Sequence, residues 1–466
     1  MARHVTILEH GGDRGDHGGR LRPRALSVTE PVVRSESVSV PAPARELAPR
    51  PWPAPPPELQ SRPARRRRRR TPWPIAALAL LCMTVALALQ VGHSVPPLSM
   101  SLAKQGTLTA AGAVPPLPWP SAGQAAVAVP AAGVFVSPGP ETPVPVASLT
   151  KMMTALVVLR DHPLGASDSG PKVVITMGDQ QDAAADSANN DTSIPVTAGE
   201  SLTERQLLDG LLVHSANDFA DALATWDAGS IPAFVAKMNA TAASVGMTQT
   251  QYVDPNGIST GDTSTPVDQL KLAQVAMNIP AFAAVVAQPS ITEPMAGLLS
   301  NYVSDIGTQG VVGIKSGFTQ AAMGCVVLAA DRQVAGRQVL ILAAVTGQPG
   351  FDPLDVAQAG ALSLIDAAVG GLQVVTLAPA GRLEGWLAAP WTTTRSRLVT
   401  GSSASAVVWP GTTWSSSLLA RRVTRSVNAG QVVATLDFSD GNQDLSVPVR
   451  STRALPPPSI AWRVLH

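Results

Sequence analysis

Cysteine and aromatic residues are both scarce in this chain of 466 residues, which has two cysteines and 4% aromatic side chains. Cys82 lies in an apolar run and Cys325 in a strand-like run. Neither has the neighbours that a structural disulfide, a metal cluster or a thiol nucleophile would need. Histidine is also too sparse for a histidine-based zinc site. We therefore expect no redox cross-link, metal or cofactor, and a core built mainly from Ala, Val and Leu.

A basic surface is missing from the part of the chain that should fold. The first 73 residues contain fifteen arginines and seven acidic residues, whereas the remaining positions contain nineteen basic and twenty-six acidic residues. Nucleic-acid binding depends on cationic side chains that contact phosphates. The charge distribution therefore predicts no nucleic-acid partner.

The N-terminal part of the sequence predicts a membrane anchor. Residues 1–73 are rich in Pro, Arg, Ser and Glu without hydrophobic periodicity, which predicts a disordered basic arm. An uncharged apolar stretch follows at 74–92, long enough for one bilayer crossing. Because the Arg65–Arg70 run should stay in the cytoplasm, we expect a single-pass protein of the cell membrane, with a cytoplasmic N-terminus and an extracytoplasmic domain at 123–370. A cleaved signal peptide is the alternative, although the leader is long and no clear cleavage site follows it.

Three further segments follow the anchor. Residues 93–122 are Pro-rich and predict a semi-rigid linker. Residues 123–370 show helical spacing over 147–160, around 202–224 and over 231–245, then three β-rich runs that predict an antiparallel meander at 310–318, 322–331 and 338–347. Residues 371–466 contain short Val/Thr/Ser strands and turns, which predict a small β-rich domain. The fold class is therefore α+β, and we expect the chain to remain soluble and active if residues 1–122 are deleted.

Three short motifs occur in order within the 123–370 domain: Ser148-Leu149-Thr150-Lys151, Ser215-Ala216-Asn217 and Lys315-Ser316-Gly317. Each motif alone is weak, because a capped helix or a polar loop would also contain such residues. Their combination on a helix, a loop and a strand is the arrangement of active-site serine enzymes that recognise penicillin.

The spacing of the motifs suits nucleophilic catalysis. Positions i and i+3 of a helix share a face, so Lys151 can take the proton of the Ser148 hydroxyl. Burial and the second cation, Lys315, should lower the pKa of Lys151 enough for this task. The backbone N–H groups of Ser148 and Phe318 are expected to stabilise the oxyanion. Ser215 would relay a proton to the leaving amine, and the side-chain amide of Asn217 would hold the substrate's peptide amide.

Four stretches resemble the D-alanyl-D-alanine carboxypeptidase family of low-molecular-mass penicillin-binding proteins: ASLTKMMTALVVL, GESLTERQLLDGLLVHSANDFADALA, MNATAASVGMTQTQYVDPNG and GIKSGFTQAAMGCVVLAA. The resemblance covers about residues 125–350 and implies a penicillin-binding-protein or serine β-lactamase-like domain. It implies that a peptidoglycan stem peptide ending in D-Ala-D-Ala acylates Ser148 and releases D-alanine, and that β-lactams acylate the same serine. Lys315 and Ser316 would hold the terminal carboxylate, and Gly317 would leave room for the substrate.

The chain departs from the family pattern in three respects. It has KSG where KTG is common, so a methyl group is lost and we expect the carboxylate to be held less tightly in place. Its anchor precedes the catalytic region, whereas many relatives use a C-terminal amphipathic helix. The β-rich domain resembles the family's second domain only in position and composition, so its role stays open.

Other functions remain as alternatives. A serine β-lactamase shares the motifs, but one large class needs a deacylating glutamate, and Glu293 is the only glutamate between Asn217 and Lys315. A Ser-His-Asp hydrolase would have to use His214 or His162, without a G-x-S-x-G elbow. A cell-wall scaffold that has lost turnover is the non-enzymatic alternative. Sequence also leaves open whether a D,D-peptidase would act as a carboxypeptidase or an endopeptidase.

Overall fold

The computed structural model describes residues 73–466, so the predicted disordered arm lies outside the described residues. The first described element is helix α1, Trp73–Gly92, with a mean hydropathy of 2.3 and no buried residue. A helix rises about 1.5 Å per residue, so its 20 residues match the hydrocarbon thickness of one bilayer. By length and composition, α1 can cross a membrane once.

A five-stranded antiparallel sheet forms the centre of the region predicted over residues 123–370, in the order β11-β12-β13-β3-β4. Its strands are β3 Gln124–Val129, β4 Val134–Val136, β11 Val311–Thr319, β12 Met323–Val334 and β13 Arg337–Gln348. The three-stranded meander predicted from the sequence is confirmed, with the KSG motif on β11.

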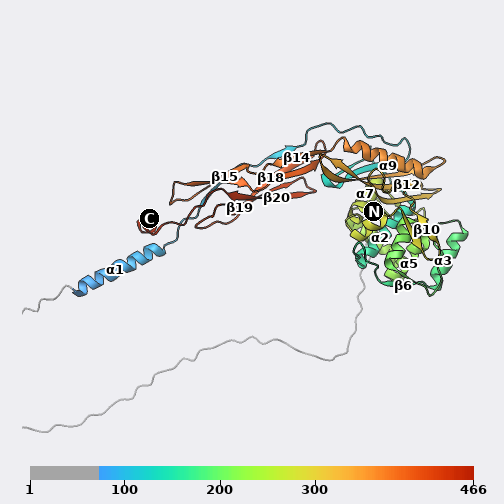
Figure 1. Cartoon of the computed structure of the whole chain (residues 1–466), viewed down its shortest axis with the longest axis horizontal. Helices are drawn as coiled ribbons and strands as arrows, with labels where there is room; N and C mark the ends of the chain where they lie inside the picture. Colours follow the sequence, from blue (N-terminus) through green and yellow to red (C-terminus); the bar gives the residue numbers. More distant parts are fainter. Residues whose placement is uncertain (1–72) are drawn as a thin grey trace, which may run out of the picture. The chain divides into compact units, whose positions relative to one another are not determined.

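Helices cover both faces of this sheet, because buried apolar side chains of β12 point alternately to one face and to the other. Successive side chains of a strand point to opposite faces, and those of β12 enter two separate cores: Val326, Leu328 and Ala330 in one, Cys325, Val327 and Ala329 in the other. Helix α9, Pro353–Val369, packs on the first face, and α7, Pro266–Ala276, on the second (Figure 1). Apolar residues on both faces of a strand are what such a layered α+β arrangement requires.

The remaining helices of this region gather around the second core. They are α2 Thr150–Asp161, α3 Met177–Ala188, α4 Glu204–Val213, α5 Asn217–Ala228, α6 Ile231–Val245 and α8 Pro280–Val286. Three two-stranded ribbons connect them: β5 Val144–Pro145 with β8 Thr263–Ser264, β6 Lys172–Val174 with β7 Ser201–Thr203, and β9 Ser290–Glu293 with β10 Gly297–Ser300. Every residue of α2 from Thr150 to Leu159 is buried.

The C-terminal region is a β domain with its own core around Trp414, which is 1% exposed. A seven-stranded sheet runs β1-β15-β16-β20-β19-β18-β2, and β14 pairs with β17. The strands are β14 Gln373–Ala378, β15 Leu383–Ala388, β16 Arg395–Thr400, β17 Ala404–Val408, β18 Thr413–Ala420, β19 Val432–Ser439 and β20 Asp444–Ser451, followed by helix α10 Ile460–Leu465.

The segment 93–122, predicted as a linker, contributes to that β domain. Strand β1, Ser99–Leu102, pairs with β15, and β2, Thr107–Thr109, pairs with β18. Met100 and Leu102 alternate with serines and pack against the core around Trp414. The proline content of the segment favoured an extended spacer, but short alternating pieces between the prolines suffice for edge strands.

Candidate active site

Ser148 lies in a single 3-10 turn, Ala147–Leu149, that leads directly into α2. Ala147 has a φ of 49°, a left-handed conformation that is unfavourable for a residue with a side chain. Two glycines allow other backbone segments to approach this turn closely. A Cβ on Gly317 would lie 2.7 Å from the backbone N of Ser148, and a Cβ on Gly257 would overlap the carbonyl oxygen of Ala147. The turn that presents the serine is therefore fixed by close backbone packing.

Lys151 is fully buried and its amine contacts three acceptors. Its Nζ lies 3.0 Å from the Oγ of Ser148, 2.6 Å from the Oδ1 of Asn217 and 2.5 Å from the carbonyl oxygen of Asn256. An ammonium has three hydrogens and can donate to all three. A neutral amine has two hydrogens, which the two asparagine oxygens can accept, so its lone pair is left for the Ser148 hydroxyl. The same geometry thus suits both protonation states.

The pKa of Lys151 is lowered to about 8, chiefly by burial, while the carboxylates of Asp221 and Asp254 raise it in opposition. Burial and then the charge of Lys151 lower the pKa of Lys315 well below its usual value. The charge of Lys151 thus acts on Lys315, whereas burial, rather than the second cation expected from the sequence, lowers the pKa of Lys151. An amine with a pKa near 8 is partly neutral at physiological pH, as a general base requires.

The second motif occupies the short connection between α4 and α5. Ser215 has a φ of 66°, is 5% exposed and lines the cleft beside Ser148. Asn217 begins α5, and its backbone N–H donates to the carbonyl of Thr192. Its side-chain oxygen is already bound to Lys151. Sequence reasoning assigned this amide to a substrate contact only, and the structure adds a contact that positions the lysine.

The third motif supplies the opposite wall of the cleft from β11. Lys315 is 1% exposed and donates from Nζ to the carbonyl of Ser316 at 2.8 Å. Within residues 73–466 the buried Oγ of Ser316 has no hydrogen-bond partner, although it lines the cleft. Phe318 is half exposed at the same wall. A hydroxyl without a partner beside a lysine is suited to an anionic group of a ligand.

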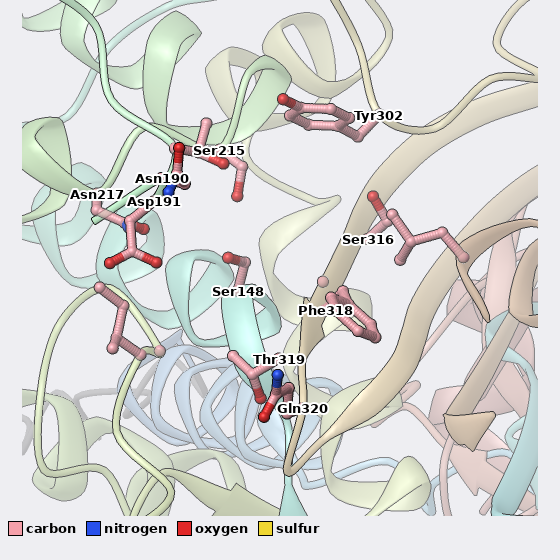
Figure 2. A pocket seen from close by; sticks show the side chains of 15 residues that line it. Ser148, Asn190, Asp191, Ser215, Asn217, Tyr302, Ser316, Phe318, Thr319 and Gln320 are labelled. Carbon is pink, nitrogen blue, oxygen red and sulfur yellow. The ribbon is translucent and has the colours of Figure 1, made fainter. Parts of the chain in front are cut away.

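These motifs converge on one cleft of about 580 Å³. Figure 2 shows Ser148 between Ser215 and Asn217 on one side and Ser316 and Phe318 on the other. Gly317 also lines the cleft, whereas Lys151 and Lys315 lie buried behind its surface. All eight residues selected from the sequence therefore lie at or directly behind this cleft, which is in the size range of small-ligand sites.

Several residues of the site were not identified from the sequence. Asn256 belongs to a loop in which Asp254 accepts backbone N–H groups from Asn256, Gly257 and Ser259. The VDPNG residues end one of the stretches that carry the family resemblance, but nothing local indicated that they contact Ala147 and Lys151. Asn190, Asp191 and Tyr302 also line the cleft and carried no motif.

The geometry bears on the alternative catalytic residues. The group in contact with the Ser148 hydroxyl is a lysine, while His214 stacks on Tyr302 with ring centroids 5.3 Å apart. Burial, followed by the charge of Lys315, lowers the pKa of His214. Glu293 lies buried on β9, and no glutamate is among the residues that line the described cleft. Neither a histidine-based triad nor the β-lactamase glutamate is assembled here.

Comparison with known proteins identifies a family of similar sequences. The sequence profile of a family described as D-alanyl-D-alanine carboxypeptidase matches residues 121–347. DacB2, a D-alanyl-D-alanine carboxypeptidase of Mycobacterium tuberculosis, is 35% identical over 42% of this chain and 65% of its own length. A D-alanyl-D-alanine carboxypeptidase of Streptomyces sp. strain K15 is 33% identical over 40% of this chain and 67% of its own length. A D-alanyl-D-alanine endopeptidase of Pseudomonas aeruginosa is 31% identical over 42% and 62%.

The chain thus spans about two thirds or less of the length of these curated relatives. Among solved structures, the D-alanyl-D-alanine carboxypeptidase DacD of Francisella tularensis covers 74% of this chain and 95% of its own, with a TM-score of 0.51 and 19% identity. This likeness supports the predicted penicillin-binding-protein fold.

Proposed function

This chain belongs to the D-alanyl-D-alanine carboxypeptidase family, and from that membership and the geometry of the cleft we propose that it is a serine D,D-peptidase. It removes the terminal D-alanine from peptidoglycan stem peptides through an acyl-enzyme on Ser148. The observation that carries the proposal is the 3.0 Å contact between the amine of Lys151 and the hydroxyl of Ser148, in a cleft that the other two motifs complete.

Substrate binding uses the wall formed by β11. The terminal carboxylate of the peptide is held by the unpartnered Oγ of Ser316 and by the charge of Lys315. A carboxylate at this position favours the protonated form of Lys315, because an opposite charge raises the pKa of an amine. Binding of the substrate carboxylate therefore promotes protonation of Lys315, and the resulting ammonium holds that carboxylate.

Acylation begins when the neutral amine of Lys151 takes the proton of Ser148. The Oγ then forms a bond to the carbonyl carbon of the penultimate D-alanine, and the backbone N–H groups of Ser148 and Phe318 stabilise the oxyanion. The C–N bond breaks as Ser215 gives its proton to the leaving amine and receives the proton held by Lys151, so D-alanine departs and Lys151 is neutral again. Water then hydrolyses the ester and restores the free serine. A β-lactam would acylate Ser148 by the same first step.

The anchor completes the proposal. Helix α1 holds the enzyme at the cell membrane, with the preceding arginines in the cytoplasm and the peptidase domain outside. If intact cells are treated with a protease, we expect the 123–466 region to be cleaved, because it lies outside. Protection of that region and cleavage of the N-terminal arm would reverse the proposed orientation.

The catalytic proposal is tested by labelling with a fluorescent penicillin, with Ser148→Ala as the control, and by mass spectrometry of purified stem peptides. We expect serine-dependent label and the loss of one alanine from a pentapeptide. Folded protein without label would favour the scaffold alternative. Cleavage of cross-linked peptides without loss of a terminal alanine would assign an endopeptidase instead.

A further inference from the structure

One side chain in the cleft carries a charge that the catalytic steps do not use. Among the residues that line the cleft, Asp191 is the single Asp, Glu, His, Lys or Arg, since Lys151 and Lys315 are 0% and 1% exposed and lie behind the surface. Asp191 is half-buried and lies in the connection between α3 and β7. The proposed mechanism needs no carboxylate at this position, so the residue requires another explanation.

The backbone at Asp191 is held in place, and its carboxylate has no partner among residues 73–466. Its backbone N–H donates to the carbonyl of Asp186 at 2.9 Å, and the next residue, Thr192, accepts the backbone N–H of Asn217 at 2.9 Å. Across residues 73–466, neither a hydrogen bond nor an ion pair of the structure engages the Asp191 side chain. The pKa of neighbouring Asp186 is raised by burial and then by the charge of Asp191. A carboxylate on a fixed backbone, without a counter-charge among the described residues, is available for a cation of the ligand.

The position of Asp191 indicates which part of a substrate it meets. Figure 2 shows Asp191 on the side of Ser148 opposite to Ser316 and Phe318. A terminal carboxylate cannot bind near Asp191 without repulsion, whereas Ser316 and Lys315 suit it. With the carboxylate at Ser316 and the scissile bond at Ser148, the residues before D-Ala-D-Ala extend toward Asp191.

We propose that Asp191 binds the side-chain ammonium of a diamino acid that directly precedes D-Ala-D-Ala. The inference rests on the proposed function, because it assigns the specificity of that same cleft. It concerns the shared chemistry of a terminal ammonium, which both lysine and meso-diaminopimelate supply. The contact would be a charge-assisted hydrogen bond in a half-buried site, which favours peptides with a free amine.

The test compares D-alanine release from four peptides: the lysine and the meso-diaminopimelate peptide, each with the side-chain amine free and acetylated. Rates are normalised to the fraction of enzyme labelled by fluorescent penicillin. For the parent protein we expect kcat/KM to be about tenfold higher for the free amine in at least one pair, the low end for a charged hydrogen bond. Asp191→Asn should bring that ratio close to one, and Asp191→Glu should restore part of it.

Asp182→Asn is the matched control, because Asp182 is an exposed acid on α3 outside the cleft, and it should keep the parent's ratio. Rising salt should also shrink the ratio in the parent protein, which tests the charge without any substitution. Equal rates within both pairs, or an unchanged ratio in Asp191→Asn, would overturn the inference and leave the proposed function intact. If a penicillin-reactive enzyme released D-alanine from none of the peptides, the proposed function and the inference would fall together.

Discussion

At the scale of single residues, Lys151 is held between two opposing influences on its proton. Burial favours the neutral amine, whereas nearby carboxylates, Asp221 first, favour the ammonium. The outcome is a pKa of about 8, more than two units below an ordinary lysine. Desolvation alone would make the amine a weaker base than catalysis needs, and the carboxylates alone would keep it protonated.

The first prediction concerns pH. Acylation needs the neutral form of Lys151, so its rate should rise about tenfold per pH unit below the pKa and level off above it. The second-order rate constant for a fluorescent penicillin, measured from about pH 6 to pH 10, should bend near pH 8. Lys151→Ala should acylate at least a hundredfold more slowly, the lower limit for loss of a general base. An acylation rate constant of the parent protein that does not change between about pH 6 and pH 8 would remove Lys151 from this role.

The second prediction concerns the close approach of Gly317 to Ser148. In Gly317→Ala the new methyl group would stand 2.7 Å from the backbone N of Ser148, so the strand or the turn must move. We expect acylation to fall about a hundredfold, since small displacements at a reacting group are costly. The control is Gly360→Ala on α9, where the nearest atom is 3.9 Å from the new Cβ. Near-parental acylation in Gly317→Ala would show that the contact is not required.

At the scale of elements, the sequence predicted those parts of the site whose signal is local. The helix after Ser148 and the KSG strand were visible because periodicity and motif coincide within about ten residues. The loop that contains Asn256 was not, because its contact with Lys151 joins residues 105 positions apart. Asp191 and Tyr302 were also missed, because they lie in connections between elements, where the sequence has no hydrophobic periodicity or motif to mark a residue that lines a cleft.

The third prediction concerns that loop. The Asp254 carboxylate accepts N–H groups from Asn256, Gly257 and Ser259, so it fixes the backbone carbonyl that binds Lys151. Asp254→Ala should lower the free energy of unfolding by about 2–3 kcal/mol through lost charged hydrogen bonds. Acylation should fall as well, because the amine loses one of its fixed acceptors.

Denaturant unfolding and penicillin labelling of the folded fraction separate the two effects. Thr176→Ala, which removes the N-cap of α3, serves as a control that should cost about 1 kcal/mol and spare acylation. Equal acylation per folded molecule in Asp254→Ala and Thr176→Ala would show that the loop stabilises the fold without positioning the lysine.

At the scale of the whole molecule, segment 93–122 precedes the catalytic region in sequence but forms part of the C-terminal β domain that follows it. Strands β1 and β2 form the two edges of the seven-stranded sheet, although β3 and the entire catalytic region separate them from their partners in sequence. Such distant pairing could not be anticipated from composition, because the prolines around these strands dominate the local signal. Leu98 and Ala110, which flank them, are buried in the core around Trp414.

The fourth prediction follows from this arrangement and compares two deletions. A fragment of residues 93–466 keeps both edge strands, whereas a fragment of residues 123–466 loses them. The cleft is built from residues after 147 in both, so both should be labelled by penicillin at Ser148. The shorter fragment should unfold more readily, because loss of a buried leucine alone removes about 2 kcal/mol.

Hydrogen exchange locates the effect. Amides of β15 and β18 that pair with β1 and β2 should lose protection in the shorter fragment, while those of β20 in the sheet interior should change least. Equal protection of β15 and β18 in the two fragments would show that residues 93–122 act as the linker that their composition suggests. Selective exposure of β15 and β18 would instead make this segment part of the β domain, so the shortest stable soluble enzyme would begin after α1 rather than at the first catalytic strand.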